Sequence, residues 1–545
     1  AVRPTLLQKM VDNYILNKDQ QQLLNYSLIM LAVLIIEVVF QFSFTFYANW
    51  LGQHVIKDIR VKLFERILKF KMQYFTNNPV GKLVTRVVSD IETIASIFGQ
   101  GLFTIISEVL QMIVIMCVML WMNWRLALIV FTVLPLIIYA TKIFQIKIKS
   151  AFQDVRNQVA NLNSFVQERI SGMKIVQLFT REKIEYDKFV AINEKHKKAH
   201  IRTVWYYSIF FPIAEMLSSI TLGVVVWYGG LNAAVDITTS VGDIISFIMM
   251  SNMLFRPLRQ IADKFNTLQM GMVAADRVFK VLDDTAEEND TGTIVANGLK
   301  GDIKFDNVWF SYINDEKVLQ GVSFDVKHGE RIAVVGATGA GKSTIINLLN
   351  RFYDIDSGSI VIDGIESNKY TLQSLRDQIS VVLQDVFLFS DSILNNITLN
   401  NKSISLEEVT IAAKKIGIHD FIMTLPNNYH YNVKERGGML SVGQRQLIAF
   451  LRAYVSKPAI LVLDEATSSI DAHSEELIQK ATDTITRNRT SIIIAHRLST
   501  IKKADRILVM EKGKIVEQGT HRQLLKQKGY YSKLYEMQFA TALVS

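Results

Sequence analysis

Four stretches of this chain are long and apolar enough to cross a lipid bilayer as helices, and they limit the possible fold more than any other feature. They lie at residues 28–50, 98–120, 126–144 and 204–230. The hydrocarbon core of a bilayer takes about 20 helical residues to span, and in lipid only helices and closed barrels satisfy every backbone polar group. The first half of the chain is therefore predicted to be a helical membrane domain.

Lysine and arginine are distributed unevenly between the segments that join these stretches. The segments 51–97 and 145–203 are rich in bases, whereas the loops on the opposite side carry almost none. Because cytoplasmic loops collect Lys and Arg, the two basic segments are predicted to lie inside the cell. Their apolar positions recur at helical spacing, so they are expected to continue the membrane helices into the cytoplasm. If the second half is also cytoplasmic, a fifth, shorter apolar stretch at residues 244–255 must cross the membrane as well.

Composition and charge exclude several other classes of protein. With 49% hydrophobic and 20% charged residues, the chain is too apolar to be disordered. Its single cysteine, Cys117, excludes an internal disulfide framework and a cysteine-based zinc site. A net charge of +9 suits nucleic acid, anionic lipid or nucleotide, but the spanning stretches argue against a soluble DNA-repair ATPase. We therefore expect no nucleic-acid partner.

The two halves of the chain meet at an acidic segment. Residues 1–282 are predicted to form the membrane domain, residues 283–299 a weakly structured linker, and residues 300–545 a soluble α/β domain. Residues 1–20 carry a few apolar positions followed by a polar run. We expect them to be the end of a first membrane helix that is truncated here.

The second half contains a phosphate-binding loop in its required context. A β-branched strand at residues 332–335 leads into Gly336-Ala-Thr-Gly-Ala-Gly341, then Lys342 and Ser343, and an apolar helix follows. This is the G-x-x-x-x-G-K-[ST] pattern between a strand and a helix. Its backbone N–H groups and the helix N-terminus attract phosphate, Lys342 reaches the terminal phosphates, and the Ser343 hydroxyl ligates Mg²⁺. The domain is therefore predicted to bind ATP with Mg²⁺.

A second apolar strand, residues 459–463, ends in the carboxylates Asp464 and Glu465. Asp464 fits the Mg²⁺-associated aspartate of phosphate-loop folds, and Glu465 is placed to polarise an attacking water. A strand that ends in Asp-Glu is, taken alone, as often a plain cap. The phosphate loop in the same domain makes the catalytic interpretation the stronger one.

Two further motifs complete a recognisable order. Leu440-Ser-Val-Gly-Gln444 lies between the phosphate loop and the acidic strand, and Ile494-Ala495-His496-Arg497 follows that strand. This order resembles the ATP-binding cassette of ABC transporters. With the membrane half fused to the cassette, the whole chain resembles half-size exporters of the multidrug and lipid-flippase type. The resemblance implies a six-helix α-helical transmembrane domain followed by an α/β cassette.

The resemblance also implies roles for single residues. Tyr312 matches the aromatic residue that stacks on adenine, and Gln384 matches the glutamine that touches Mg²⁺ and the attacking water. His496 matches the histidine that contacts the γ-phosphate and orders Glu465. Asp471 matches a segment that links the two ATP sites of a dimer. The catalytic residues implied are thus Glu465, His496, Lys342 and Gln384, and the Mg²⁺ ligands are Ser343, Gln384 and Asp464.

In this family two cassettes close head to tail, so that each ATP lies between the phosphate loop of one chain and the LS-x-GQ segment of the other. By this resemblance Ser441 and the Gly443 backbone contact the γ-phosphate, while Val442 stands where the family usually has glycine. The implied ATP-binding set is Tyr312, Gly336, Ala337, Thr338, Gly339, Ala340, Gly341, Lys342, Ser343, Thr344, Gln384, Ser441, Gly443, Gln444, Asp471 and His496. Residues 74–81, 168–179 and 435–438 resemble the segments that transmit cassette closure to the membrane helices.

The implied function is ATP-driven export or flipping of a hydrophobic drug or lipid by a dimer with alternating access. Both halves of a composite ATP site are present in this chain, so a homodimer is favoured over a heterodimer. Of another class, a cassette-gated channel stays open, although no regulatory insertion supports it. The expected partners are a second half-transporter chain, membrane lipid and the substrate. The expected location is the inner cell membrane, multi-pass, with the cassette in the cytoplasm.

Three acids, Glu37, Glu108 and Glu215, lie within apolar stretches. Charges inside a membrane are costly and by default indicate function. The simpler interpretation is that each faces the helix bundle and hydrogen-bonds a neighbouring Ser, Thr or Gln. The sharper hypothesis is that at least one faces the cavity and favours cationic amphiphiles. A lipid or lipopolysaccharide-precursor flippase is equally compatible with an apolar cavity.

Overall fold

The computed structural model describes residues 2–235, 239–313, 316–464, 472–495 and 497–537. Its internal contacts divide the chain into two units. The first consists of Ala1–Leu68 and Asn78–Thr285, and the second of Lys69–Asn77 and Ala286–Ser545. The short segment 69–77 thus belongs by its contacts to the second unit, although its neighbours along the chain belong to the first.

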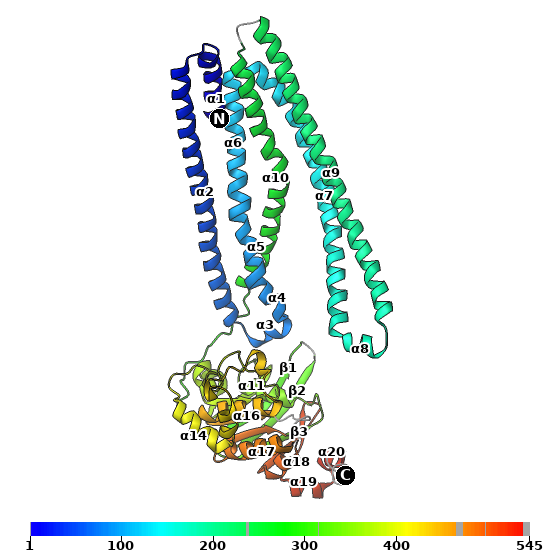
Figure 1. The fold of residues 1–545 in the computed structure, drawn as a ribbon. Helices are drawn as coiled ribbons and strands as arrows, with labels where there is room; N and C mark the ends of the chain where they lie inside the picture. The colour runs from blue at the N-terminus through cyan, green and yellow to red at the C-terminus, as the bar shows by residue number, and fades with distance from the viewer. Residues whose placement is uncertain (1, 236–238, 314–315, 465–471, 496, 538–545) are drawn as a thin grey trace. The chain divides into compact units, whose positions relative to one another are not determined.

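The first unit is helical throughout its described length (Figure 1). Its long helices are α2 (Gln20–Leu68), α6 (Phe103–Met122), α7 (Trp124–Ser171), α9 (Glu182–Val235) and α10 (Val241–Leu282). The shorter ones are α1 (Val2–Lys9), η1 (Met10–Ile15), α4 (Val80–Thr85), η2 (Arg86–Asp90), α5 (Ile91–Ser96), η3 (Ile97–Leu102) and α8 (Met173–Leu178). As predicted, α2, α7 and α9 run without a break from the apolar stretches into the basic segments.

Four helical runs are long and apolar enough to cross a membrane, namely Gln20–Leu68, Val80–Met122, Trp124–Ser171 and Glu182–Ala234. They contain the four predicted stretches. The proposed fifth crossing, residues 244–255, lies inside α10, a helix of 42 residues. The described residues of α10 do not contain a stretch that is long and apolar enough to be identified as a membrane span. Many apolar side chains of α2 are exposed, for example Phe40 with 71% of its surface exposed. An apolar face of this extent requires lipid or another helix to cover it.

The core of the first unit lies where α6, α7, α9 and α10 pack, around Met119, Val130, Val225 and Phe247. α1 and η1 are fastened to the start of α10. Asp12 accepts hydrogen bonds from the Gly242 amide at 2.8 Å and from the Ser240 hydroxyl at 2.5 Å. Because Ser240 is also the N-cap of α10, Asp12 fixes the position of that helix end.

The second unit is the predicted α/β domain, built on two sheets. The six-stranded sheet has the order β10-β9-β3-β8-β7-β6, and the four-stranded sheet the order β2-β1-β4-β5. In the larger sheet the neighbours from β9 to β6 are parallel, and only β10 runs antiparallel. Its strands are β3 (Arg331–Gly336), β6 (Ile379–Val382), β7 (Ile460–Asp464), β8 (Thr490–Ile494), β9 (Arg506–Glu511) and β10 (Lys514–Gly519). The smaller sheet has β1 (Ile303–Ser311), β2 (Lys317–Val326), β4 (Ser357–Ile362) and β5 (Ile365–Glu366).

Helices cover the sheets and enclose two hydrophobic cores, one on either side of β3. Alternate side chains of β3 enter different cores, Ala333 and Val335 one of them, Ile332 and Val334 the other. This burial on both faces explains the continuous apolar run in the sequence. The helices are α3 (Met72–Asn77), α11 (Lys342–Leu349), α12 (Leu372–Asp377), α13 (Ile393–Thr398), α14 (Leu406–Ile416), α15 (His419–Thr424), α16 (Val442–Val455), α17 (Ala472–Thr486), α18 (Leu498–Lys503), α19 (His521–Gln527) and α20 (Tyr530–Tyr535).

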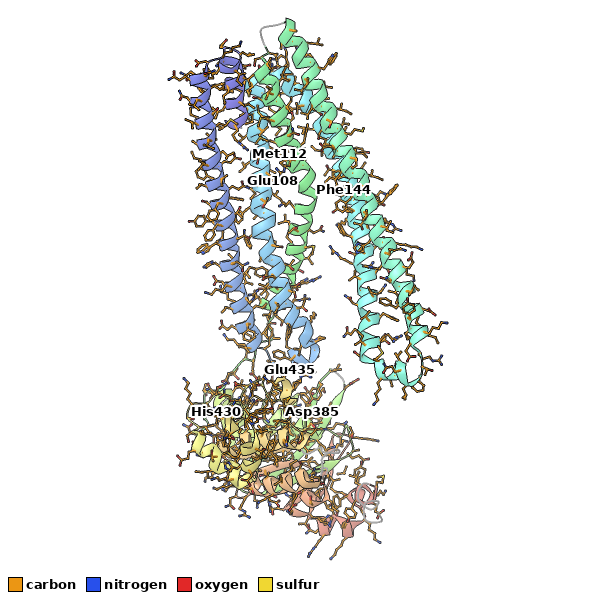
Figure 2. All side chains as sticks on the ribbon, viewed as in Figure 1. Glu108, Met112, Phe144, Asp385, His430 and Glu435 are labelled. Carbon is orange, nitrogen blue, oxygen red and sulfur yellow. The ribbon has the colours of Figure 1, made fainter. Side chains whose placement is uncertain are left out.

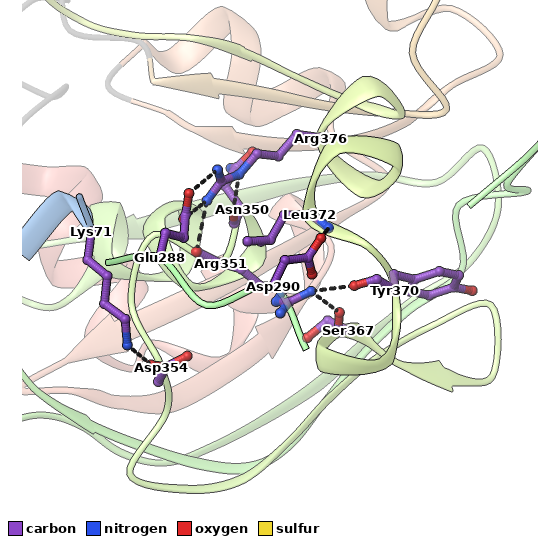
Figure 3. A network of polar contacts seen from close by, with 10 residues as sticks. All are labelled: Lys71, Glu288, Asp290, Asn350, Arg351, Asp354, Ser367, Tyr370, Leu372 and Arg376. Carbon is purple, nitrogen blue, oxygen red and sulfur yellow. Dashed lines mark hydrogen bonds and ion pairs between the residues drawn. The ribbon is translucent and has the colours of Figure 1, made fainter. Parts of the chain in front are cut away.

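The segment expected to be a weakly structured linker is held to the cassette from Ala286 onward. Figure 3 shows the polar network responsible, in which Arg376 binds the Glu288 carboxylate, with one pair of atoms 3.0 Å apart. The same guanidinium donates to the backbone carbonyls of Asn350 and Arg351 at 3.1 and 3.0 Å. Asp290 accepts a hydrogen bond of 2.9 Å from the Leu372 amide. These bonds order residues that composition alone indicated were loose.

Replacing Arg376 by Ala is expected to lower the free energy of unfolding of the second unit by about 2 kcal/mol. Hydrogen bonds to charged groups contribute about 1.5–3 kcal/mol, and solvent screening reduces this because both partners are 29% exposed. The unfolding midpoint should then fall by about 4 to 8 °C in calorimetry of the full chain in detergent. Arg522→Ala, on the exposed side of α19, is the matched control. Equal midpoints for the two variants would contradict the role of the network.

Candidate functional site

The phosphate loop joins β3 to α11 and depends on glycine at defined positions. Gly339 and Gly341 have φ angles of 82° and 98°, in the left-handed region that glycine adopts without strain. A Cβ at Gly336 would lie 2.3 Å from the Met510 carbonyl oxygen, and one at Gly341 would lie 2.7 Å from Leu319. The loop therefore has no room for side chains at these two positions. Its backbone amides precede the N-terminus of α11, a position that favours anions.

Lys342, the first residue of α11, is buried beneath this loop. Its Nζ donates to the carbonyl oxygens of Gly336 and Ala337 at 2.8 and 3.0 Å. Burial lowers the pKa of the Lys342 ammonium below its ordinary value, and the nearby Asp464 carboxylate opposes part of that shift. An anion at the loop would favour the charged form of this lysine still further.

Oxygen ligands gather at the carboxyl ends of the parallel strands. The Ser343 hydroxyl lies 3.4 Å from the Asp464 carboxylate at the end of β7. Gln384 follows β6 by two residues and is exposed at the same edge of the sheet. A hydroxyl, a carboxylate and an amide oxygen are hard ligands of the kind Mg²⁺ prefers, and Mg²⁺ usually completes its shell with water and phosphate. The residues present therefore fit Mg²⁺ bound together with a nucleotide.

Tyr312 lies beside the phosphate-loop helix, within a group of aromatic rings. Its hydroxyl accepts a hydrogen bond of 3.0 Å from the Asn347 amide and lies 3.3 Å from the Thr344 hydroxyl. Its ring packs edge-on against Tyr353, with the centroids 5.0 Å apart. Tyr353 in turn shares a hydrogen bond of 3.0 Å with the hydroxyl of Thr76 on α3. No sequence motif indicated Tyr353, whereas Thr76 lies within residues 74–81, which resemble a segment that transmits cassette closure.

The LS-x-GQ segment forms a capped helix start. Ser441 is the N-cap of α16 and makes a capping box with Gln444, at 3.2 and 2.8 Å. Gly443 is buried, whereas Val442 keeps 47% of its surface exposed, so the valine does not disturb the packing inside this chain. Arg445 donates to the carbonyl of Leu440 at 2.8 Å, which fastens the segment to the preceding turn.

The described structure brings part of the predicted set together. The Ser343 hydroxyl contacts Asp464, whose carboxylate also acts electrostatically on Lys342, and Tyr312 touches the same helix, α11. Ser441 and Gln444 bond to each other, and in the described part of the chain neither bonds to the phosphate loop. The predicted residues Glu465, Asp471 and His496 lie outside the described residues.

The three acids in the membrane helices have different surroundings. Glu37 forms an ion pair of 2.9 Å with Arg3 on α1. Its partner is therefore a base rather than the expected Ser, Thr or Gln, and its charge is already neutralised within the chain. Glu215 is exposed on α9. Glu108 lies one turn from Met112 on α6 (Figure 2), and its Oε2 atom is buried without a hydrogen-bond partner among the described residues. Its charged neighbours are the bases Arg256 and Lys264 of α10. Such neighbours offset the attraction of Glu108 for a cationic ligand.

Comparisons with known proteins were made for the whole chain. Residues 1–258 match the family described as the ABC transporter transmembrane region, and residues 319–468 match the ABC transporter family. The chain is 37% identical to YknV of Bacillus subtilis, an ABC transporter ATP-binding protein, over 91% of this chain and 82% of that one. It is 36% identical to the ATP-dependent lipid A-core flippase of Pseudoalteromonas translucida, over 96% and 90%. The solved structure of a bacterial Atm1-family ABC exporter with ATP bound is similar to it, with TM-score 0.78, 28% identity, and coverage of 98% and 95%.

Proposed function

The chain belongs to the ABC transporter family as a half-size exporter, and we propose that two copies of it form a homodimer with two complete ATP sites. Such an exporter couples ATP hydrolysis to the export or flipping of a hydrophobic or amphipathic substrate. One observation carries the proposal. The chain supplies both the phosphate loop and a well-formed LS-x-GQ helix start, yet within the described residues the two do not bond to each other. A second copy would provide the missing half of each site.

The proposed hydrolysis uses residues from several strand ends. Lys342 holds the terminal phosphates, and Glu465, next to the anchored Asp464, accepts a proton from the attacking water. His496 orients Glu465, and Gln384 positions the water. When bound by Ser343, Gln384 and Asp464, Mg²⁺ neutralises phosphate charge. Ser441 and the Gly443 amide of the second copy would contact the γ-phosphate, so closure of the dimer completes the site.

The proposed coupling begins at the adenine side of the site. Tyr312 would stack on adenine, and its ring touches Tyr353, whose hydroxyl is bonded to Thr76. Thr76 lies on α3, between α2 and α4 in the chain, so movement at the nucleotide can reach two membrane helices through covalent bonds. ATP favours the closed, outward-facing state only through contacts that this state alone makes. Hydrolysis removes those contacts and returns the transporter to the inward-facing state.

The proposed setting is the inner cell membrane, with the cassette in the cytoplasm. The basic segments 51–97 and 145–203 support this orientation. The proposed substrate is a lipid or a hydrophobic small molecule, and a relative named as a lipid A-core flippase supports the lipid side of that choice.

The homodimer can be tested by complementation between two defective copies. Purified alone in lipid nanodiscs, the chain is expected to be an active Mg²⁺-ATPase with the mass of two copies. Lys342→Ala and Ser441→Arg chains should each be silent, because each damages both sites of its own homodimer. Co-expression of the two should restore part of the activity, because a mixed dimer retains one intact site.

Silence of the unaltered chain alone would contradict the homodimer. It would favour a heterodimer that needs a different second chain. Failure of the mixed dimer to regain activity, with both chains shown to be present in it, would contradict sites that are shared between copies.

A further inference from the structure

A cavity of about 740 Å³ lies in the second unit, along one edge of the six-stranded sheet. β6 is the strand at that edge, and its residues 379–381 line the cavity. The other walls come from the end of α12, from residues between 397 and 408, and from the end of α16. We call this cavity the β6 cleft. Its lining includes none of the described residues that are predicted to bind ATP or Mg²⁺.

The open edge of β6 presents backbone groups that no neighbouring strand uses. The Ile460 amide of β7 donates to the Gln378 carbonyl oxygen at 3.0 Å, and Ile379 is in register with Ile460. Because successive residues of a strand direct their backbone groups to opposite sides, those of Ile379 and Val381 point away from β7. They form no hydrogen bond with any other described residue. Two donors and two acceptors therefore remain for a ligand in the cleft.

The two edges of the six-stranded sheet also differ in sequence. Proteins usually prevent an edge strand from pairing with another chain by placing charged residues or proline in it. β10, at one edge, carries Lys514 and Glu517. β6, at the other edge, reads Ile-Ser-Val-Val and has neither a charged residue nor proline. The sequence of β6 thus leaves it able to accept a further strand.

Arg452, at the end of α16, supplies a positive charge to the β6 cleft. Its Nε atom donates to the Asn396 carbonyl oxygen at 2.8 Å, and its Nη2 atom lies 3.4 Å from the Phe387 carbonyl oxygen. Burial lowers the pKa of the Arg452 guanidinium below its ordinary value, and no carboxylate in the described ranges offsets this shift. A carboxylate brought into the cleft by a ligand would compensate this charge.

The other charged residues of the β6 cleft are already compensated. Lys457 is bonded to Glu408 at 3.0 Å. Arg376 is bonded to Glu288 in the network of Figure 3. Asp377 is exposed, so water solvates its carboxylate. The buried charge that lacks a partner is therefore positive, and the cleft favours an acidic ligand.

We propose that the β6 cleft binds an extended acidic peptide segment of a partner protein, which adds to β6 as a further strand. Hydrogen bonds to the backbone of Ile379 and Val381 would supply affinity, and an acidic side chain on Arg452 would supply specificity. A small carboxylate compound would meet Arg452 but leave the strand edge unpaired. The acidic segment of this chain, residues 283–290, is already held by Arg376 and the Leu372 amide, so the strand comes from another protein.

The position of β6 indicates why a partner bound there matters. β6 ends at Val382, two residues before Gln384. An added strand would therefore pair with the backbone that leads directly to a proposed ligand of Mg²⁺. The inference goes beyond ATP-driven transport and does not depend on it, because peptide binding requires neither nucleotide nor dimer closure.

The test measures peptide binding by fluorescence anisotropy, with the full chain in nanodiscs and no nucleotide. The parent probe is the labelled peptide Thr-Val-Glu-Val-Thr, and a second probe has Gln in place of Glu. Two further probes carry N-methyl groups, one on the amides of its first, third and fifth residues, the other on those of its second and fourth. Because only one side of an added strand faces β6, one methylated peptide should bind roughly thirtyfold more weakly and the other as the parent does.

The role of Arg452 is tested by a cycle of two substitutions. On the unaltered chain the Gln peptide should bind roughly tenfold more weakly than the Glu peptide, as for loss of a hydrogen bond to a charged group. Arg452→Gln should remove this preference. Arg487→Gln, an exposed arginine outside the cleft, is the matched control and should keep it. If Arg452→Gln does not fold, the four peptides on the unaltered chain decide the question.

Several outcomes would overturn the proposal. Absence of saturable binding by the parent peptide would contradict the site. Equal weakening by the two methylated peptides would contradict strand addition, and equal binding of the Glu and Gln peptides would contradict an acidic ligand. Competition by free glutamate as effective as that by unlabelled peptide would assign the cleft to a small anion. Peptide binding that weakens as the protein concentration rises would assign it to a second copy of this chain.

Discussion

Replacing Glu465 by Gln is expected to reduce the ATPase rate of the purified chain by roughly 10²- to 10⁴-fold, the range for loss of a general base. The strand that leads to Glu465 is fully buried up to Leu463, and Asp464 at its end lies 3.4 Å from the phosphate-loop serine. Glu465 itself lies outside the described residues, and the expectation rests on its following Asp464 directly in the sequence. Glutamine has the size of glutamate but accepts no proton from water, so ATP should still bind while turnover stops.

The measurement is the steady-state rate in nanodiscs together with the affinity for a fluorescent ATP analogue. Glu476→Gln, an exposed acid of α17, is the matched control and should keep the full rate. A Glu465→Gln chain that turns over normally would assign the proton transfer to another group. Loss of binding as well as rate would instead show that the substitution disturbs the site itself.

Replacing Lys342 by Ala is expected to lower both ATP affinity and turnover, with a loss in kcat of roughly 10²- to 10³-fold, as for removal of one preorganised electrostatic contact. Lys342 already lies under the loop, bonded to two loop carbonyls, so its charge needs little rearrangement to meet a phosphate. Its pKa is lowered by burial, and bound phosphate should raise it again. The contact is thus strongest when the nucleotide is present.

The Lys342→Ala and Glu465→Gln variants are expected to differ in their affinity for the ATP analogue. Lys342→Ala should weaken the binding of the ATP analogue, and Glu465→Gln should leave that binding unchanged. Lys514→Ala, an exposed lysine of the edge strand β10, controls for loss of charge. If Lys342→Ala keeps the affinity of the unaltered chain, the lysine is not a phosphate ligand.

The parts of the fold that sequence predicts are those with a local physical signature. Long apolar runs predict the helices of the first unit, and the pattern from Gly336 to Ser343 predicts the loop between β3 and α11. In each case the residues that interact are neighbours along the chain.

Contacts between distant parts of the chain could not be predicted in this way. Glu37 pairs with Arg3 across a helix turnaround, and Tyr353 bonds to Thr76, which lies 277 residues earlier. The acidic composition of residues 283–299 indicated a loose linker, but Arg376, far along the sequence, orders it through Glu288. Spacing carries no information about such pairs, because the fold alone brings them together.

The assignment of residues 69–77 to the second unit has a consequence for how the chain comes apart. This segment is joined covalently to helices of the first unit at both of its ends, yet Lys71 is bonded to Asp354 and Thr76 to Tyr353. A protease that cuts near residue 285 would break one of the covalent links between the two units. The other two links, at the two ends of segment 69–77, would stay intact. The two fragments should therefore stay together until a denaturant separates them. A cassette expressed from residue 286 onward would lack a piece of its own surface.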